Sequence, residues 1–154
     1  MRLVVAVVGK ARNRALGEAI RDYEKRAARY WPLDVREVRE ERATGASVDR
    51  VKEREGLRLS EKIPERAQTV ACEIDGRPFS STQFADFLQA AREQDRDVAF
   101  LIGGAFGLAA SLRTGSTLKL SLAPWTLPHE IARLVLVEQI YRAGTIVRGE
   151  PYHK

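Results

Sequence analysis

The sequence predicts a single-domain α/β protein with a mainly parallel sheet flanked by helices, and three observations support this. The chain has 154 residues, a usual length for one domain. Short apolar runs alternate along it with segments whose apolar residues recur at helical spacing. The run at 98–102 (VAFLI) is wholly apolar, as expected of a central strand covered on both faces. Strands alternating with helices are typical of an α/β domain.

The first quarter of the chain is predicted to hold two strands and a helix. Residues 2–8 (RLVVAVV) form a Val-rich run that ends at Gly9, which indicates a buried strand. Residues 13–30 carry apolar side chains at helical spacing, and Pro32 marks the end of that helix. Residues 33–38 (LDVREV) alternate apolar and charged side chains, the pattern of a half-exposed strand.

The next segment is predicted to be a helix, a strand and a turn. Ser47 is expected to cap a helix that extends towards Ile63, and Gly56 weakens its middle. Residues 68–74 (QTVACEI) predict a strand, and residues 75–78 (DGRP) predict a turn after it.

The second half of the chain has the clearer pattern. A helix is expected over 81–91, the central strand over 98–102, a short helix over 109–113, a strand over 118–122 and a long last helix over about 128–143.

The composition excludes several classes of protein. A lone Cys72 cannot form an intramolecular disulfide, and with only two histidines a Cys/His metal cluster is excluded, so no metal is expected. The N-terminal apolar run is too short for a signal peptide or a membrane span. We therefore expect a cytoplasmic protein that does not associate with a membrane.

The net charge of +5 makes an acidic partner plausible. Basic side chains concentrate in residues 1–66 and again near the C-terminus. A surface that binds nucleic acid and a surface that is merely solvated would both explain this distribution of charge.

Two loops in the second half are candidate ligand sites. Residues 103–107 (GGAFG) follow the central strand, where ligands bind in open α/β sheets, although such a segment is equally often a tight turn. Residues 121–129 (SLAPWTLPH) are stiffened by two prolines and present backbone groups, although a simple capped loop explains them as well. Thr126 or Leu127 is predicted to cap the last helix, with Pro128 in its first turn.

The last helix is apolar nearly all round, so it must be buried on all sides. At the end of a chain of this length, we expect one side on the chain's own sheet and the other on a partner, which favours a homodimer. Glu138 and Arg142 lie four residues apart, and a structural salt bridge explains both. The tail after this helix contains Arg148, Tyr152 and His153. Such a tail is either disordered or supplies groups for stacking and proton transfer.

Together, LIGGAFGL, LSLAPWTLPHEIARLVLVEQIYRA and the closing RGEPYHK resemble the SPOUT-class RNA methyltransferases of the RlmH family. The resemblance covers the whole length and is strongest over 98–154. It implies one domain over 1–154, with a C-terminal trefoil knot that binds the cofactor over about 68–144 and a tail over 145–154. It also implies a homodimer that uses S-adenosylmethionine, releases S-adenosylhomocysteine and methylates N3 of a pseudouridine in 23S ribosomal RNA, on the assembled ribosome rather than on DNA.

The resemblance also assigns site residues. It places the cofactor among three loops, at Cys72, Gly104, Ala123, Pro124, Trp125, Thr126, Leu127 and Pro128. Where the family commonly has a polar residue, this chain has Phe106, and Trp125 stands at a variable position from which it can cover the adenine.

Four residues match those that the family places around the target base. We expect His153 or His129 as the general base, Arg142 as a contact to the developing oxyanion or a phosphate, and Tyr152 as a stacking platform. The tail is expected to complete the partner subunit's site. Arg12, Arg14, Lys25, Arg26 and Arg29 either contact ribosomal RNA or form a solvated helix face.

Two alternatives stay open at this stage. A SPOUT methyltransferase for another RNA, such as tRNA, would share the cofactor loops without needing the tail. A non-enzymatic RNA- or ribosome-binding module would have lost cofactor binding, and Phe106 is the local hint towards it.

Overall fold

The structure is a computed structural model that describes residues 1–45 and 47–153, with the side chain of His153 outside the description. Its five strands form one sheet in the order β2-β1-β4-β3-β5, with every neighbouring pair parallel. The elements in chain order are β1 (Leu3–Val8), α1 (Arg14–Ala27), β2 (Leu33–Val38), α2 (Val48–Ser60), β3 (Gln68–Pro78), α3 (Ser81–Glu93), β4 (Val98–Ile102), α4 (Ala110–Gly115), β5 (Leu118–Ser121), α5 (His129–Val147) and the 3₁₀ turn η1 (Pro151–His153). The predicted α/β class is confirmed.

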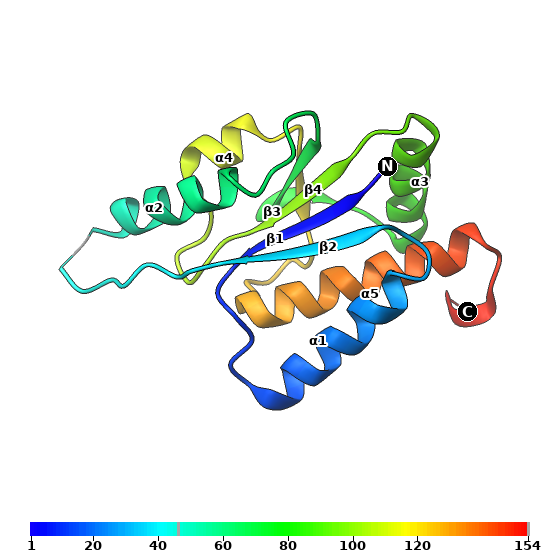
Figure 1. Cartoon of the computed structure of the whole chain (residues 1–154), viewed down its shortest axis with the longest axis horizontal. Coiled ribbons are helices and arrows are strands. Elements are labelled where there is room, and N and C mark those ends of the chain that lie inside the picture. Colours follow the sequence, from blue (N-terminus) through cyan, green and yellow to red (C-terminus); the bar gives the residue numbers. More distant parts are fainter. Residues whose placement is uncertain (46, 154) are drawn as a thin grey trace.

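Helices cover both faces of the sheet and give the fold three layers (Figure 1). The core on one face joins the sheet to α1, α3 and α5, and the smaller core on the other face joins it to α2 and α4. Alternate residues of β1 divide between the two cores, with Val5 on one side and Ala6 on the other. This double burial is the reason why β1 is apolar without interruption.

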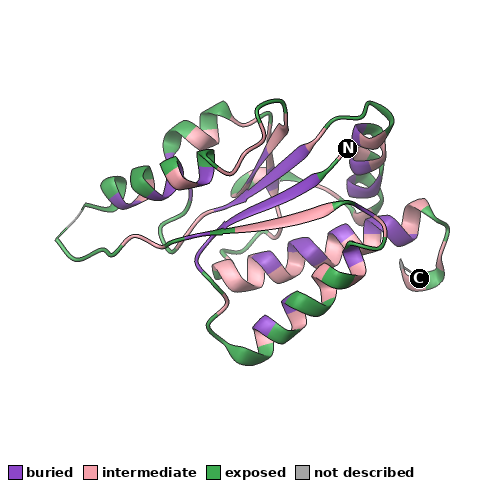
Figure 2. Cartoon of the chain, viewed as in Figure 1, coloured by how far each residue is buried: buried purple, intermediate pink, exposed green. Residues whose placement is uncertain are grey.

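Burial decreases from the middle of the sheet to its edge. Figure 2 shows that buried residues dominate β1 and β4, whereas β2 is mostly half-buried. The alternating pattern of β2 follows from its place as an edge strand, and the predicted half-exposed strand at 33–38 is confirmed. Among the described residues, no helix is long and apolar enough to cross a membrane.

The predicted turn at 75–78 is wrong, because β3 continues through these residues to Pro78. The register between β3 and β5 shifts between Cys72 and Arg77, so the extra residues form an irregularity within the strand. A Cβ on Gly76 would lie 2.6 Å from the Leu120 carbonyl carbon, so only glycine permits this approach. The helix predicted from Ser47 is likewise continuous through Gly56, where a Cβ would lie 2.8 Å from that of Ala109.

The last helix differs from its prediction at both ends. Pro128 is its N-cap residue, and no side chain caps it, so neither Thr126 nor Leu127 has the predicted role. The helix also continues past Ala143 to Val147, because its last turns remain buried against α1. A Cβ on Gly144 would overlap the ring of Tyr30, so α5 lies very close to the turn that follows α1.

Candidate functional site

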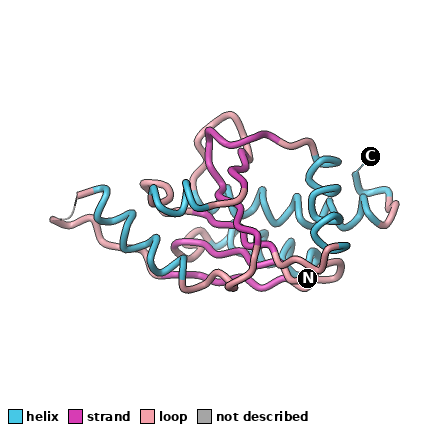
Figure 3. Tube along the Cα trace, turned by 90° about the horizontal axis from the view of Figure 1, so that it is seen from above, coloured by secondary structure: helices cyan, strands magenta, loops and turns pink. Residues whose placement is uncertain are grey.

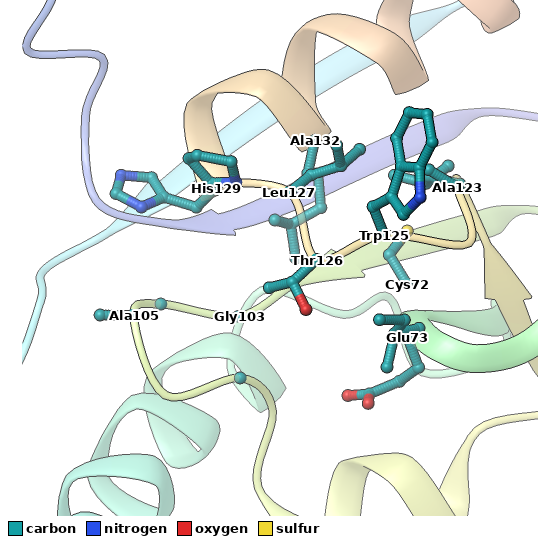
Figure 4. Close-up of a pocket in the computed structure, with 16 residues that line it drawn as sticks. Cys72, Glu73, Gly103, Ala105, Ala123, Trp125, Thr126, Leu127, His129 and Ala132 are labelled. Carbon is teal, nitrogen blue, oxygen red and sulfur yellow. The ribbon is translucent and has the colours of Figure 1, made fainter.

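A cavity of about 520 Å³ opens at the carboxyl ends of β4 and β5, beside the middle of β3. Three chain segments line it, as Figure 4 shows: 72–74 of β3, 102–105 with Gly107 at and after the end of β4, and 122–129 without Pro124 leading into α5. Ala132 from the first turn of α5 also lines it. Ligands of open α/β sheets bind at this edge, and the volume lies in the range of small-molecule and cofactor sites.

Most of the residues that the resemblance assigned to the cofactor lie around this cavity. Seven of the eight line it, and they are Cys72, Gly104, Ala123, Trp125, Thr126, Leu127 and Pro128. Pro124 does not line the cavity and is exposed. Trp125 is 76% exposed, so it lies at the rim rather than inside.

Glycines shape the loop after β4. The Gly107 amide donates to the Gly104 carbonyl at 3.0 Å, and Gly107 has a φ of 84°, which favours glycine. A Cβ on Gly103 would lie 2.5 Å from the Gly107 carbonyl carbon. The loop therefore folds back on itself and presents backbone to the cavity, while Phe106 is exposed and lines no part of it.

Glu73 is the one carboxylate in the cavity lining, and its side chain is only 12% exposed. Its Oε2 lies 3.1 Å from Nε of Arg113, which is also paired with Asp75 at 2.9 Å. Its Oε1 is buried without a hydrogen-bond partner. Burial raises the pKa of Glu73, and Arg113 opposes that shift.

His129 lies between the cavity and a group of charged residues. Its Nε2 is buried without a hydrogen bond and lies 3.8 Å from the Glu40 carboxylate, which also pairs with Arg12. Figure 4 shows the imidazole pointing away from Cys72 and Glu73. This histidine, the first residue of α5, therefore connects the cavity wall to the segment after β2.

Buried polar atoms without partners gather around this cavity. In the described part of the chain five side-chain atoms are of this kind, on Glu55, Glu73, Gln89, Arg113 and His129. Glu73 and His129 line the cavity, Arg113 pairs with Glu73, and Glu55 Oε2 would lie 2.8 Å from a Cβ on Gly104. Because buried polar groups are normally satisfied, the unpartnered Glu73 Oε1 in the cavity wall marks a place for a ligand.

Cys72 contributes packing rather than reactivity. Burial raises the pKa of its thiol to about 12, so the thiol is protonated at neutral pH. Among the described residues, no group of three or more His, Cys, Asp or Glu is arranged to hold a metal ion.

Arg142 and Tyr152 form a separate cluster at the carboxyl end of α5. Two nitrogens of Arg142 donate to Glu138 Oε1, at 3.0 and 2.6 Å, so the predicted salt bridge is present. The Tyr152 hydroxyl donates to the same oxygen at 3.1 Å and lies 3.2 Å from the Tyr23 hydroxyl. The Arg142 guanidinium lies over the Tyr152 ring, 4.8 Å from its centre.

The tail folds back onto the helices. The Tyr152 ring packs 4.6 Å from that of Tyr141, and Tyr30 donates a hydrogen bond to Glu150. The described tail therefore has a defined place, and Figures 1 and 3 show it at the opposite end of the molecule from α2.

The structure does not bring the four predicted catalytic residues together within one chain. His129 lies at the cavity, whereas Arg142 is 13 residues further along the same helix, about 20 Å at the rise of an α-helix. Tyr152 accompanies Arg142, and the side chain of His153 lies outside the described residues.

The predicted basic surface is partly neutralised. Arg12 pairs with Glu40, Arg14 with Glu18 at 3.0 Å and Arg26 with Asp22 at 2.8 Å. Lys25 and Arg29 are exposed.

Sequence reasoning missed Glu73 and Glu55. Glu73 had a detectable signal, because it is the one charged residue in the run QTVACEI. Glu55 had none, because a Glu before a glycine in a charged helix looks like surface.

Fold and cavity together define a parallel α/β protein with a cavity of small-molecule size at the carboxyl ends of its central strands, beside the start of α5. The family model described as "Predicted SPOUT methyltransferase" matches residues 1–153. The chain belongs to the SPOUT methyltransferases and, within them, to the RlmH family.

Relatives of this family match over their full lengths. The chain is 56% identical over 154 residues to the ribosomal RNA large subunit methyltransferase H of Gemmatimonas aurantiaca, with all of both chains covered. It is 42% identical over 159 residues to the protein of the same name from Listeria welshimeri, again with both chains fully covered. The corresponding protein of Geotalea daltonii is 40% identical, with 99% of each chain covered.

Proposed function

We propose that this protein transfers a methyl group from S-adenosylmethionine to N3 of a pseudouridine in 23S ribosomal RNA, on the assembled ribosome in the cytoplasm. The observation that carries the proposal is the cavity at the carboxyl ends of β4 and β5, in a chain whose full-length relatives are named for large-subunit rRNA methylation.

The residues of the cavity fit an adenosine-type cofactor. Its walls are mostly apolar, and the 122–128 loop adds backbone groups that suit a purine. The Thr126 hydroxyl, the Glu73 carboxylate and the His129 imidazole are polar side chains of its lining (Figure 4). The unpartnered Oε1 of Glu73 leaves hydrogen-bonding capacity for a ligand.

The cofactor supplies a methyl group already activated on a sulfonium, so the protein mainly holds and aligns the reactants. The imide N3 of pseudouridine must lose its proton, for which His153 or His129 is the general base. Arg142 stabilises the negative charge that develops on the base, and Tyr152 stacks on the ring.

A homodimer reconciles these roles with the separation along α5. The Arg142–Tyr152 cluster lies about 20 Å from the cavity of its own chain, so it serves the partner subunit's cavity. The side of α5 that carries Ile131, Leu134 and Val135 is only half-buried in one chain, which suits an interface. The trefoil knot over about 68–144 is part of the same proposal.

The first test is calorimetric titration with S-adenosylmethionine and S-adenosylhomocysteine, combined with mass measurement under native conditions. Micromolar binding to a dimer is expected, and extracts of denatured protein must be checked for copurified cofactor. A folded dimer that binds neither ligand would favour the non-enzymatic binding module.

The second test is transfer of labelled methyl groups to assembled ribosomes, free 23S RNA and tRNA. Incorporation into ribosomes alone, located at pseudouridine N3 by mass spectrometry of RNA fragments, is expected. Preferential labelling of tRNA would instead establish the alternative RNA target.

A further inference from the structure

A second hollow, of about 670 Å³, lies beside the cofactor cavity, and residues of two adjacent loops line it. The segment after β1 and the segment at the end of β2 form it, and the Gly9 amide joins them by donating to the Val38 carbonyl at 2.9 Å. Its lining residues are Gly9, Lys10, Arg12 and 37–42.

We propose that this hollow binds the phosphodiester backbone of the RNA next to the target nucleotide, through Lys10, Arg39 and Arg42. The inference rests on the proposed function, because it names where the RNA substrate of that cavity is held.

The charges of the hollow favour an anion. Each of its three carboxylates already has a basic partner, in the pairs Glu37–Arg133, Glu41–Arg54 and Glu40–Arg12. The guanidinium groups of Arg54 and Arg58 also lower the pKa of Glu41, so this carboxylate remains paired as an anion.

The remaining cations are free to bind a ligand. Lys10, Arg39 and Arg42 are exposed, and none of them forms an ion pair with another residue that the structure describes. Because the carboxylates are compensated, the hollow offers three cations to a polyanion such as the RNA backbone.

Glu40 places this hollow directly against the cofactor cavity. Its carboxylate lies across Gly9, where a Cβ would overlap it, and it contacts both Arg12 and His129. His129 is itself a lining residue of the cavity. One carboxylate thus separates the two spaces, so a backbone held in the hollow delivers its neighbouring base to the cavity.

The binding segment is also held in place. The Arg58 guanidinium donates to the Arg39 carbonyl at 2.9 Å, and Glu55 accepts from the Glu41 amide at 3.0 Å. Arg39 and Arg42 therefore project from a segment that α2 anchors, which lowers the entropy lost when they bind.

The test compares the double variant Arg39→Gln/Arg42→Gln with the matched control Arg66→Gln/Arg96→Gln. The control removes the same charge from exposed residues that precede β3 and β4. They lie at the amino ends of these strands, whereas the hollow lies at the carboxyl ends of β1 and β2. We measure KM for assembled ribosomes, the salt dependence of ribosome binding, and the Kd for S-adenosylhomocysteine.

We expect KM for ribosomes to rise roughly tenfold or more in the hollow variant, and the slope of log Kobs against log salt to fall by about 1 to 2. Cofactor Kd should stay unchanged, and the control should behave as wild type. An unchanged KM, or an equal rise in the control, would overturn the inference. Failure of the proposed function is distinguishable, because the wild-type protein would then bind no cofactor or methylate no ribosome.

Discussion

The two ends of α5 differ in how completely their polar groups are satisfied. At the amino end, Glu73 and His129 retain buried atoms without hydrogen bonds, around a cavity with mostly apolar walls. At the carboxyl end, Glu138, Arg142 and Tyr152 satisfy one another and hold rigid positions. The first arrangement is that of a site completed by a ligand, and the second that of a preformed surface presented to another molecule.

The most severe test of the amino end is Gly103→Ala. Its Cβ would lie 2.5 Å from the Gly107 backbone, so the loop must change shape. We expect cofactor affinity to fall by more than 100-fold, measured by calorimetry, with a loss of about 1–3 kcal/mol in the free energy of unfolding. Gly115→Ala is the control, because nothing lies within 4 Å of its added Cβ. Wild-type cofactor affinity in Gly103→Ala would contradict the assignment of this loop.

The carboxyl end is tested by mixing subunits. Arg142→Ala should reduce methyl transfer about 100-fold or more while leaving the cofactor Kd unchanged, because Arg142 lies far from its own cavity. Mixing it with Gly103→Ala chains should restore about a quarter of wild-type activity, since half the dimers then carry one intact composite site. No recovery, with mixed dimers verified by native mass, would place both defects in the same subunit's site.

Glu55 provides a stability test beneath the glycine loop. Burial raises its pKa, and the hydrogen bond from the Glu41 amide opposes that shift. The charge of Glu40 adds to it, and that of Arg58 opposes it. A raised pKa means that the folded state binds more protons, so the free energy of unfolding falls as pH rises from the ordinary glutamate pKa of 4.5 through the folded pKa. Glu55→Gln should therefore stabilise the protein by about 1 kcal/mol at pH 8 and by less at pH 5.

Denaturant titrations of Glu55→Gln and wild type at both pH values check this difference. If the gain in free energy of unfolding over wild type is smaller at pH 8 than at pH 5, the ionised carboxylate stabilises the loop instead.

The smallest effect concerns Cys72. With a thiol pKa of about 12, the native protein should react with iodoacetamide at pH 7.5 far more slowly than the unfolded chain. Mass spectrometry of timed samples checks the rate, and rapid native alkylation would mean that the cavity wall opens readily.

Local pattern predicted most of the elements, and the misses have physical causes. The strand at 98–102 is confirmed because a doubly covered strand must be apolar throughout. The turn at 75–78 failed because Asp-Gly chemistry suits either a turn or a strand irregularity, and pairing with β5 decided between them. Gly56 did not break its helix, because burial of one face of α2 outweighs the low helix propensity of glycine, and the close approach to Ala109 leaves no room for a side chain there.

The candidate site divides along the same line. By itself, the sequence determined the parallel α/β class, the glycine loop after β4 and the proline-stiffened loop before α5, because periodicity and backbone chemistry are local. Only the tertiary structure decided that Glu73 lines the cavity, that Arg142 and Tyr152 lie about 20 Å from it, and that Glu40 lies between it and a basic hollow. These relations depend on contacts between residues far apart in the chain, which no local pattern records.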